Sequence, residues 1–234
     1  MKSSQALLSV EGLGRQLGDR WLWRGVNFEL FSGDCVGLVA PSGAGKTLLM
    51  RNLVLLDPLQ QGEVRLEGKP LSAWSLPAYR SRVMYVPQRA TPIGILVSSR
   101  VANAARSEFD GTVQDNLKQV FELGVHRQRQ FDPDIIHTWL ARLGRGPEFL
   151  SLQGARLSGG EAQILALLRS LQLDPQVLLL DEPTASLDAA TTASVEALLH
   201  DWLQHPHRAC LMTSHDAEQI HRFTHRQLDL RDFA

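Results

Sequence analysis

The hydrophobic pattern along the chain alternates between short apolar runs and stretches of helical period. Four runs are apolar almost throughout and predict buried parallel strands. They are Val36–Ala40, Val83–Val86, Val177–Leu180 and Cys210–Thr213. Between the runs, apolar residues recur at i, i+3, i+4 and i+7, as from Ile136 to Leu143 and from Val195 to Trp202, which predicts helices with one buried face. Strands that alternate with helices predict an α/β domain with a mostly parallel sheet.

The first 35 residues and residues 62–71 do not follow this alternation. From Glu63 to Glu67, polar and apolar side chains alternate with a period of two, and Gly68-Lys69-Pro70 follows. Such a pattern, ended by Gly and Pro, is typical of an antiparallel strand and a turn. We therefore expect an antiparallel β-subdomain toward the N-terminus.

The middle of the chain has a different character again. Residues 90–157 show a helical period and no convincing strand. We therefore expect a single domain over residues 1–234, in which 1–89 and 158–234 form the α/β core with its antiparallel portion. Residues 90–157 would then be a helical subdomain inserted into that core.

The composition excludes several classes of protein. Of the 234 residues, 44% are hydrophobic and 21% are charged, so neither a disordered chain nor a fibrous repeat fits. The net charge of −1 provides no overall positive field, and we expect no nucleic-acid partner. The longest uncharged run, Cys35 to Gly45, is far shorter than the roughly 20 residues that span a bilayer.

The N-terminal residues and the cysteines favour the cytosol. Met1 to Gln5 contain no apolar segment of a secretion signal. Cys35 and Cys210 each lie in an apolar run, which predicts buried free thiols in a reducing compartment. We therefore expect a cytosolic globular protein.

A glycine-rich segment follows the first of the four apolar runs and leads into an apolar helix at Leu48. Its residues are Pro41, Ser42, Gly43, Ala44, Gly45, Lys46 and Thr47. Strand, glycine-rich loop and helix in this order indicate a phosphate-binding loop, because backbone N–H groups and the helix N-terminus point toward an anion. Lys46 can reach the β- and γ-phosphates, and the Thr47 hydroxyl can bind Mg²⁺. The alternative is an ordinary strand-to-helix turn with a surface lysine.

Two carboxylates end the apolar run 177–180. Asp181 and Glu182 follow it directly, and strand ends of this kind face the ligand crevice in open α/β sheets. Asp181 is placed to support the Mg²⁺ shell, and Glu182 to accept a proton from an attacking water. The alternative is that the pair caps a following helix.

Other segments carry further candidate site residues. Leu157-Ser158-Gly159-Gly160-Glu161 leads into a leucine-rich helix, so Ser158 and the N–H groups at the start of that helix can form a second anion site. Gln88 and His215 each lie just beyond a predicted strand. A lone histidine is more often structural or exposed than catalytic.

Together these segments resemble the ATP-binding subunit of an ABC transporter. The ordered set is Ala40–Thr47, Gln88, Leu157–Glu161, Leu178–Glu182, Ser186-Leu187-Asp188 and His215. It covers nearly the whole chain, and the LSGGE sequence is its most family-specific part, since phosphate-binding loops occur in many NTPase families. The resemblance implies a P-loop NTPase core that hydrolyses ATP with Mg²⁺.

In that family, two such subunits pair head to tail and enclose two ATP molecules. Carried over to this sequence, Ser158, Gly159 and Gly160 of one copy would contact the γ-phosphate held by Lys46 of a second copy. The resemblance therefore implies a homodimer in which ATP favours the closed state and hydrolysis withdraws that preference.

The resemblance also assigns roles to single residues. Glu182 would be the general base, His215 would contact the γ-phosphate, and Asp188 would link the two active sites. The catalytic set would be Lys46, Gln88, Glu182 and His215. The metal site would be formed by Thr47, Gln88 and Asp181. The nucleotide would contact Pro41, Ser42, Gly43, Ala44, Gly45, Lys46, Thr47 and Leu48, together with Ser158, Gly159, Gly160 and Asp188.

A membrane partner follows from the same resemblance. A separate permease subunit would carry the substrate, and this chain would lie peripherally on the inner face of the cell membrane. We expect the region of Gln88 and Ala90–Phe109 to receive a cytoplasmic helix of the permease. The compact length, Asp132-Pro133-Asp134 and Arg169–Gln172 are similar to small bacterial ATPases linked to iron or metal efflux.

The sequence departs from the family pattern in places. The connection from Gln88 to Gly111 is longer than usual, which favours an extended first helix of the subdomain over an altered docking surface. Ala40 opens the phosphate loop where glycine is usual. Leu17 stands where an aromatic usually stacks on adenine; Trp21 or Trp23 could replace it, although packing in the core is favoured for both. Base selectivity is left open by this difference.

Other interpretations compete at two levels. His221 and His225 have an i, i+4 spacing, but no adjacent carboxylate or cysteine completes a metal site, which favours solvated side chains. For the whole chain, the rival is a soluble ABC ATPase in a process such as iron–sulfur cluster assembly. A non-hydrolysing interaction module is disfavoured because both Glu182 and His215 are present.

Overall fold

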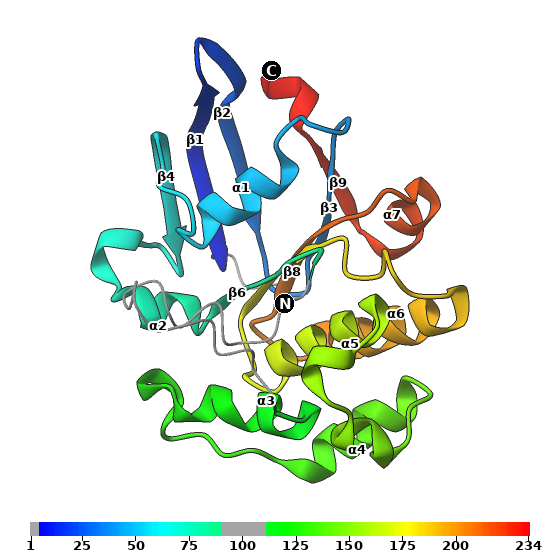
Figure 1. Cartoon of the computed structure of the whole chain (residues 1–234). Helices are drawn as coiled ribbons and strands as arrows, with labels where there is room; N and C mark the ends of the chain where they lie inside the picture. The colour runs from blue at the N-terminus through cyan, green and yellow to red at the C-terminus, as the bar shows by residue number, and fades with distance from the viewer. Residues whose placement is uncertain (1–4, 90–110) are drawn as a thin grey trace. The chain divides into compact units, whose positions relative to one another are not determined.

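The computed structural model describes residues 5–89 and 111–234, which form two compact units (Figure 1). Unit 1 consists of Met1–Pro87, Pro175–Pro183 and Leu199–Ala234, and unit 2 of Gln88–Asp174 and Thr184–Leu198. Residues 158–174 and 184–198, which the sequence assigns to the α/β core, fall in unit 2. The helix considered for residues 95–109 lies outside the described residues.

Unit 1 contains a five-stranded parallel sheet of order β6-β7-β8-β3-β9. Its strands are β3 (Cys35–Val39), β6 (Val83–Val86), β7 (Val177–Asp181), β8 (Ala209–Thr213) and β9 (Arg226–Asp229). Four of them confirm the strands predicted from the apolar runs. The edge strand β9 was missed because Leu228 is its one buried residue, so it has no apolar run.

A second sheet of unit 1 is antiparallel and has the order β2-β1-β4-β5. Its strands are β1 (Leu8–Leu17), β2 (Arg20–Leu30), β4 (Gln61–Leu66) and β5 (Lys69–Pro70). In β4, Val64 and Leu66 are buried while their neighbours are not, as the period of two predicts. The α/β fold with a parallel sheet and an N-terminal antiparallel sheet is therefore confirmed.

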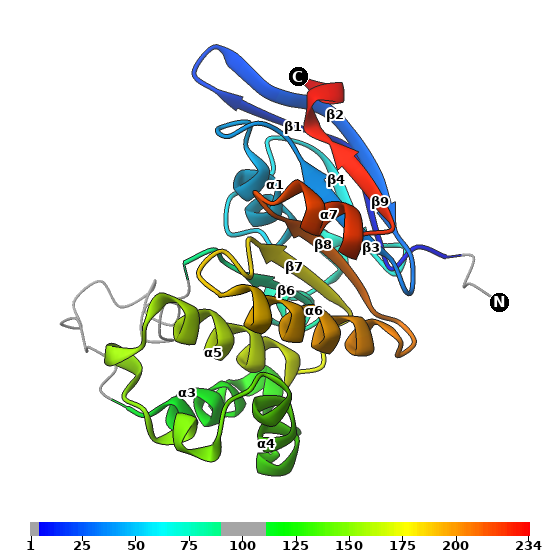
Figure 2. The same cartoon turned by 90° about the vertical axis from the view of Figure 1, so that its right-hand side faces the viewer.

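One hydrophobic core joins the two sheets of unit 1. Val10 and Val64 of the antiparallel sheet belong to the same buried cluster as Val36 and Leu179 of the parallel sheet. Helix α1 (Lys46–Leu53) adds apolar side chains to it, and α2 (Leu76–Arg80) adds a tyrosine. Figure 2 shows α1 beside the strands of the antiparallel sheet. Helix α7 (Ala217–Phe223) and the short turns η1 (Leu71–Ala73) and η7 (Leu230–Phe233) complete this unit. The strand before the phosphate-loop segment and the helix after it are thus both packed in this core.

The two cysteines lie opposite each other on adjacent strands of the parallel sheet. Cys35 of β3 pairs with Cys210 of β8, both thiols are free and fully buried, and their Sγ atoms are 2.8 Å apart. Burial raises the pKa of the Cys210 thiol well above its usual value. The prediction of buried free thiols is confirmed.

Unit 2 is built mainly from helices. They are α3 (Val113–Gln119), α4 (Pro133–Arg142), α5 (Gly159–Leu171), the short turns η3 (Val120–Glu122), η4 (Gly124–His126), η5 (Pro147–Ser151) and η6 (Gly154–Arg156), and the first part of α6 (Ala189–Leu203). Ile136 and Leu140 are buried in α4, as their spacing predicts. Helix α6 buries Val195 and Leu198 in the same way. Within residues 5–89 and 111–234, every helix is too short or too polar to cross a membrane.

Candidate functional site

The phosphate-loop segment joins β3, which ends at Val39, to α1, which begins at Lys46. Gly43 and Gly45 have φ angles of 79° and 91°, in the left-handed region that favours glycine. At Gly45 a Cβ atom would also lie 2.8 Å from Trp23 Nε1. The turn therefore requires glycine at these positions, and the backbone N–H groups at the start of α1 remain directed toward the loop.

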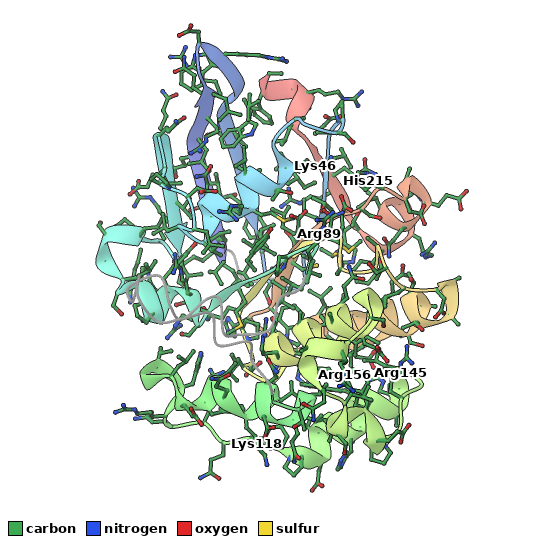
Figure 3. The ribbon with its side chains drawn as sticks, viewed as in Figure 1. Lys46, Arg89, Lys118, Arg145, Arg156 and His215 are labelled. Atoms are coloured by element: carbon green, nitrogen blue, oxygen red, sulfur yellow. The ribbon has the colours of Figure 1, made fainter. Side chains whose placement is uncertain are left out.

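The Lys46 side chain contacts the backbone of its own loop. Its Nζ donates a hydrogen bond to the carbonyl oxygen of Ala40 at 2.8 Å and to that of Pro41 at 3.3 Å. Figure 3 shows Lys46 at the start of α1. The ammonium group is thus fixed at the phosphate loop, and its contact with the β- and γ-phosphates stays a prediction.

Thr47 and Asp181 are 134 positions apart in the sequence and share a hydrogen bond. Thr47 Oγ1 donates to Asp181 Oδ2 at 2.7 Å, and Asp181 is only 3% exposed at the end of β7. The two residues predicted to hold Mg²⁺ therefore meet. The capping alternative for Asp181 and Glu182 is wrong, because the next helix, α6, begins only at Ala189.

Glu182 and His215 form the second close pair of unit 1. Their side chains approach to 2.7 Å between Glu182 Oε1 and His215 Nε2. The Glu182 side chain is 8% exposed and that of His215 is 63% exposed, so the carboxylate is buried and the imidazole borders solvent. Figure 3 labels His215. Glu182 also has a φ of 52°, a conformation that non-glycine residues rarely adopt and that clusters at functional sites. Its backbone N–H is held by Thr213 Oγ1 at 3.0 Å.

Tyr85 and Thr213 belong to this group of side chains, although the sequence did not single them out. The Tyr85 hydroxyl donates to Asp181 Oδ2 at 2.9 Å, and Thr213 Oγ1 donates to Asp181 Oδ1 at 2.9 Å. Burial, together with the charge of Asp181, raises the pKa of the Tyr85 phenol, so that it remains a donor at neutral pH. The available signal was position: both residues lie near the ends of strands adjacent to β7.

The signature segment lies in unit 2, where Ser158 begins α5 with a capping box. Ser158 Oγ donates to Glu161 Oε2 at 2.7 Å and accepts the Glu161 backbone N–H at 3.3 Å. These hydrogen bonds lower the pKa of Glu161. A Cβ atom on Gly160 would lie 2.8 Å from the carbonyl oxygen of Ser186, so this position requires glycine. The helix N-terminus predicted as a second anion site is therefore well defined.

Gln88 and Asp188 also belong to unit 2. Asp188 Oδ1 accepts the backbone N–H of Thr191 at 2.8 Å just before α6, which lowers the pKa of Asp188 and identifies it as a cap of that helix. Gln163, 4% exposed, donates through Nε2 to the Gln88 carbonyl oxygen at 3.2 Å and accepts the Ser186 N–H at 3.0 Å. Gln163 was not predicted; its one signal was a polar residue inside a leucine-rich helix.

The remaining candidates have structural roles or stay exposed. Trp23 is 1% exposed and belongs to the core, as favoured from the sequence. For Trp21 that expectation is wrong, because its side chain is only partly buried and lies outside the core cluster. Leu17 is 50% exposed. His225 Nδ1 accepts the backbone N–H of Cys35 at 3.1 Å. Across residues 5–89 and 111–234, His, Cys, Asp and Glu form no group of three or more that could hold a metal ion.

Comparisons with known proteins agree with this geometry. Residues 23–185 match the family described as ABC transporter. The chain is 32% identical over 220 residues to the probable iron export ATP-binding protein FetA of Escherichia coli (strain K12), covering 94% of this chain and 89% of FetA. It is 30% identical over 230 residues to the aliphatic sulfonates import ATP-binding protein SsuB 1 of Nocardia farcinica (strain IFM 10152), covering 98% and 80%.

A solved structure has the same fold. It is the dimeric structure of a post-hydrolysis state of the ATP-binding cassette MJ0796 bound to ADP and Pi, with a TM-score of 0.76, 20% identity, and coverage of 95% of this chain and 94% of that one. The chain therefore belongs to the ABC transporter family. Within that family it is an ATP-binding subunit and an ABC-type ATPase.

Proposed function

We propose that this chain hydrolyses ATP at the group of side chains in unit 1 and thereby drives transport through a separate membrane subunit. The observation that supports the site most strongly is the hydrogen bond of 2.7 Å between Thr47 Oγ1 and Asp181 Oδ2. It brings the phosphate loop and the acidic strand end together, which phosphoryl transfer requires because its catalysis depends on positioning and charge.

Each candidate site residue of unit 1 has a role in this proposal. The N–H groups of residues 41–48 bind the phosphate chain, and Lys46 turns from the loop carbonyls to the β- and γ-phosphates. Glu182 accepts the proton of the attacking water. His215 contacts the γ-phosphate, and its contact with Glu182 supports a role beside that carboxylate.

The oxygen atoms of Thr47 and Asp181 fit a magnesium ion. A hydroxyl and a carboxylate are the hard donors that Mg²⁺ prefers, and Mg²⁺ is usually held by one or two protein groups together with substrate phosphates and water. When bound, Mg²⁺ would neutralise charge on the β- and γ-phosphate oxygens.

The site is completed by a second copy of the chain. Ser158, Gly159 and Gly160 of one copy contact the γ-phosphate bound to Lys46 of the other, Gln88 senses the metal and the attacking water, and Asp188 links the two sites. The exposed helix N-terminus at Ser158 supports this arrangement, since free N–H groups at the start of a helix favour an anion. The dimer described for MJ0796 supports it by similarity of fold.

For the transported substrate, we propose iron or another metal ion that leaves the cell through a permease. FetA, named as a probable iron export protein, supports this proposal. SsuB 1 is named as a sulfonate importer at similar identity, so the substrate and the direction need a direct test. The chain would lie on the inner face of the membrane as a peripheral subunit.

Reconstitution tests this function. The tagged chain is purified from detergent-solubilised membranes with its bound membrane protein, and the pair is placed in liposomes. We expect ATP-dependent movement of iron and no movement of an aliphatic sulfonate, with the Glu182→Gln pair inactive. Purification from the soluble fraction with iron–sulfur assembly proteins, and without a membrane protein, would favour the soluble alternative.

A further inference from the structure

The carboxylate of Asp181 is held by three hydroxyl groups from three elements. Thr47 and Tyr85 both donate to Oδ2, at 2.7 and 2.9 Å, and Thr213 donates to Oδ1 at 2.9 Å. Asp181 is only 3% exposed, so water has little access to replace a lost donor. Because both oxygen atoms are bonded, the carboxylate is held in one orientation.

The three donors differ in their connection to the proposed chemistry. Thr47 belongs to the phosphate loop and is itself a proposed metal ligand. Thr213 also accepts the backbone N–H of Glu182 at 3.0 Å. Tyr85 comes from β6, which pairs with β7 on the edge opposite to β8, the strand of Thr213. The Tyr85 ring packs against the hydrophobic core. Its hydroxyl therefore contacts the site at Asp181 Oδ2, the oxygen atom that Thr47 also contacts.

We infer that Tyr85 is a positioning residue for the Mg²⁺ site, acting through Asp181. This inference rests on the proposed function of the site. Without the phenol hydroxyl, Oδ2 keeps only the hydrogen bond from Thr47, whose hydroxyl is itself a proposed metal ligand. The carboxylate then lacks the one donor to Oδ2 that is independent of the metal, and it is oriented less firmly when the ion binds. Mg²⁺ tolerates such freedom poorly, because it demands near-ideal octahedral geometry. The phenol thus helps to hold Asp181 in the orientation that such an ion requires.

A purely structural hydrogen bond would behave differently, and Tyr79 offers the comparison. Tyr79 and Tyr85 are the two tyrosines of the chain. Tyr79 is buried, and its hydroxyl donates to the Leu53 carbonyl oxygen at 2.6 Å, without contact with a carboxylate. Loss of that hydroxyl should lower stability and leave the Mg²⁺ requirement unchanged.

The test compares Tyr85→Phe with the matched control Tyr79→Phe in the full-length protein. Phosphate release is measured against Mg²⁺ concentration at fixed ATP, and binding of a non-hydrolysable ATP analogue is measured with and without Mg²⁺. For Tyr85→Phe we expect the half-saturating Mg²⁺ concentration to rise about three- to tenfold, the loss typical of one hydrogen bond. Analogue binding without Mg²⁺ should not change, and Tyr79→Phe should match the wild type in both measurements.

A spectroscopic measurement on the wild type needs only one of the two variants to remain folded, because one variant is enough to assign the resonances. Tyrosine labelled with ¹³C at Cζ gives one resonance for each tyrosine, and the Tyr85→Phe or Tyr79→Phe spectrum assigns them. When Mg²⁺ is added to the protein loaded with the analogue, the Tyr85 resonance should shift and the Tyr79 resonance should stay in place.

The outcomes separate this inference from the proposed function. If the analogue binds with Mg²⁺ dependence but the Tyr85 resonance does not move, or Tyr85→Phe needs no more Mg²⁺ than the wild type, Tyr85 is only a structural residue. If the wild-type protein binds no nucleotide, the proposed function fails and the inference fails with it.

Discussion

Replacing Glu182 by glutamine is expected to reduce phosphate release by about 10²- to 10⁴-fold, the usual contribution of a general base. Glutamine has the shape of glutamate and can still bond His215, but its amide cannot take a proton from water. ATP binding should persist, since Glu182 is not part of the phosphate loop. The ATP-bound dimer should also last longer, because hydrolysis no longer ends it. Phosphate release measures the loss of hydrolysis, and analogue binding measures the ATP binding that should persist.

An exposed glutamate serves as the control for this substitution. Glu122 lies in η3 of unit 2 and is exposed, so Glu122→Gln makes the same chemical change away from the site. It should hydrolyse ATP at the wild-type rate. Should Glu182→Gln retain phosphate release within a few-fold of the wild type, Glu182 is not the base.

Lys46→Ala is expected to lower the affinity for ATP by about 10- to 100-fold, the loss of one or more charge-assisted hydrogen bonds. The Nζ atom is held at the loop by Ala40 and Pro41, so a nucleotide finds the charge already in place. The substitution removes both this charge and the support of the loop. Calorimetric titration with the ATP analogue and Mg²⁺ measures the affinity.

Two further variants separate the causes of this loss. Lys118→Ala removes an exposed lysine of α3 and should leave affinity unchanged. Lys46→Arg keeps the charge but changes its shape, so it should retain part of the affinity. Equal affinity of Lys46→Ala and wild type would mean that the phosphate chain binds elsewhere.

The parts of this structure that follow local rules could be predicted from the sequence. The apolar runs of β3, β7 and β8 are buried on both faces of a parallel sheet, so their composition alone identifies them. The phosphate loop could be predicted because glycine, lysine and the following helix are contiguous. Strand β9 could not, because it lies at an edge and takes its place from pairing with β3.

The roles that depend on pairing between distant segments could not be predicted. Tyr85 reaches Asp181 only because β6 and β7 pair in one register, which opposes Tyr85 to Leu179. In the sequence, Gln163 is only a polar residue inside a leucine-rich helix. Its role follows from its hydrogen bonds with Gln88 and Ser186, which are far from it in the sequence. The positive φ of Glu182 likewise results from the strand end and the Thr213 hydroxyl that hold it.

The central claim is that each nucleotide is enclosed by two copies of the chain, and mixing two defective variants tests it most directly. Lys46→Ala disables one half of a site, and Ser158→Asp the other, since aspartate keeps the cap of α5 but repels a phosphate. Phosphate release is measured for each variant, for their equimolar mixture, and for the wild type on dilution. We predict two inactive variants, a mixture that recovers up to about a quarter of the wild-type rate, and a wild-type rate per chain that falls on dilution. A mixture as inactive as its components, beside a wild type whose rate per chain is independent of dilution, would contradict the account.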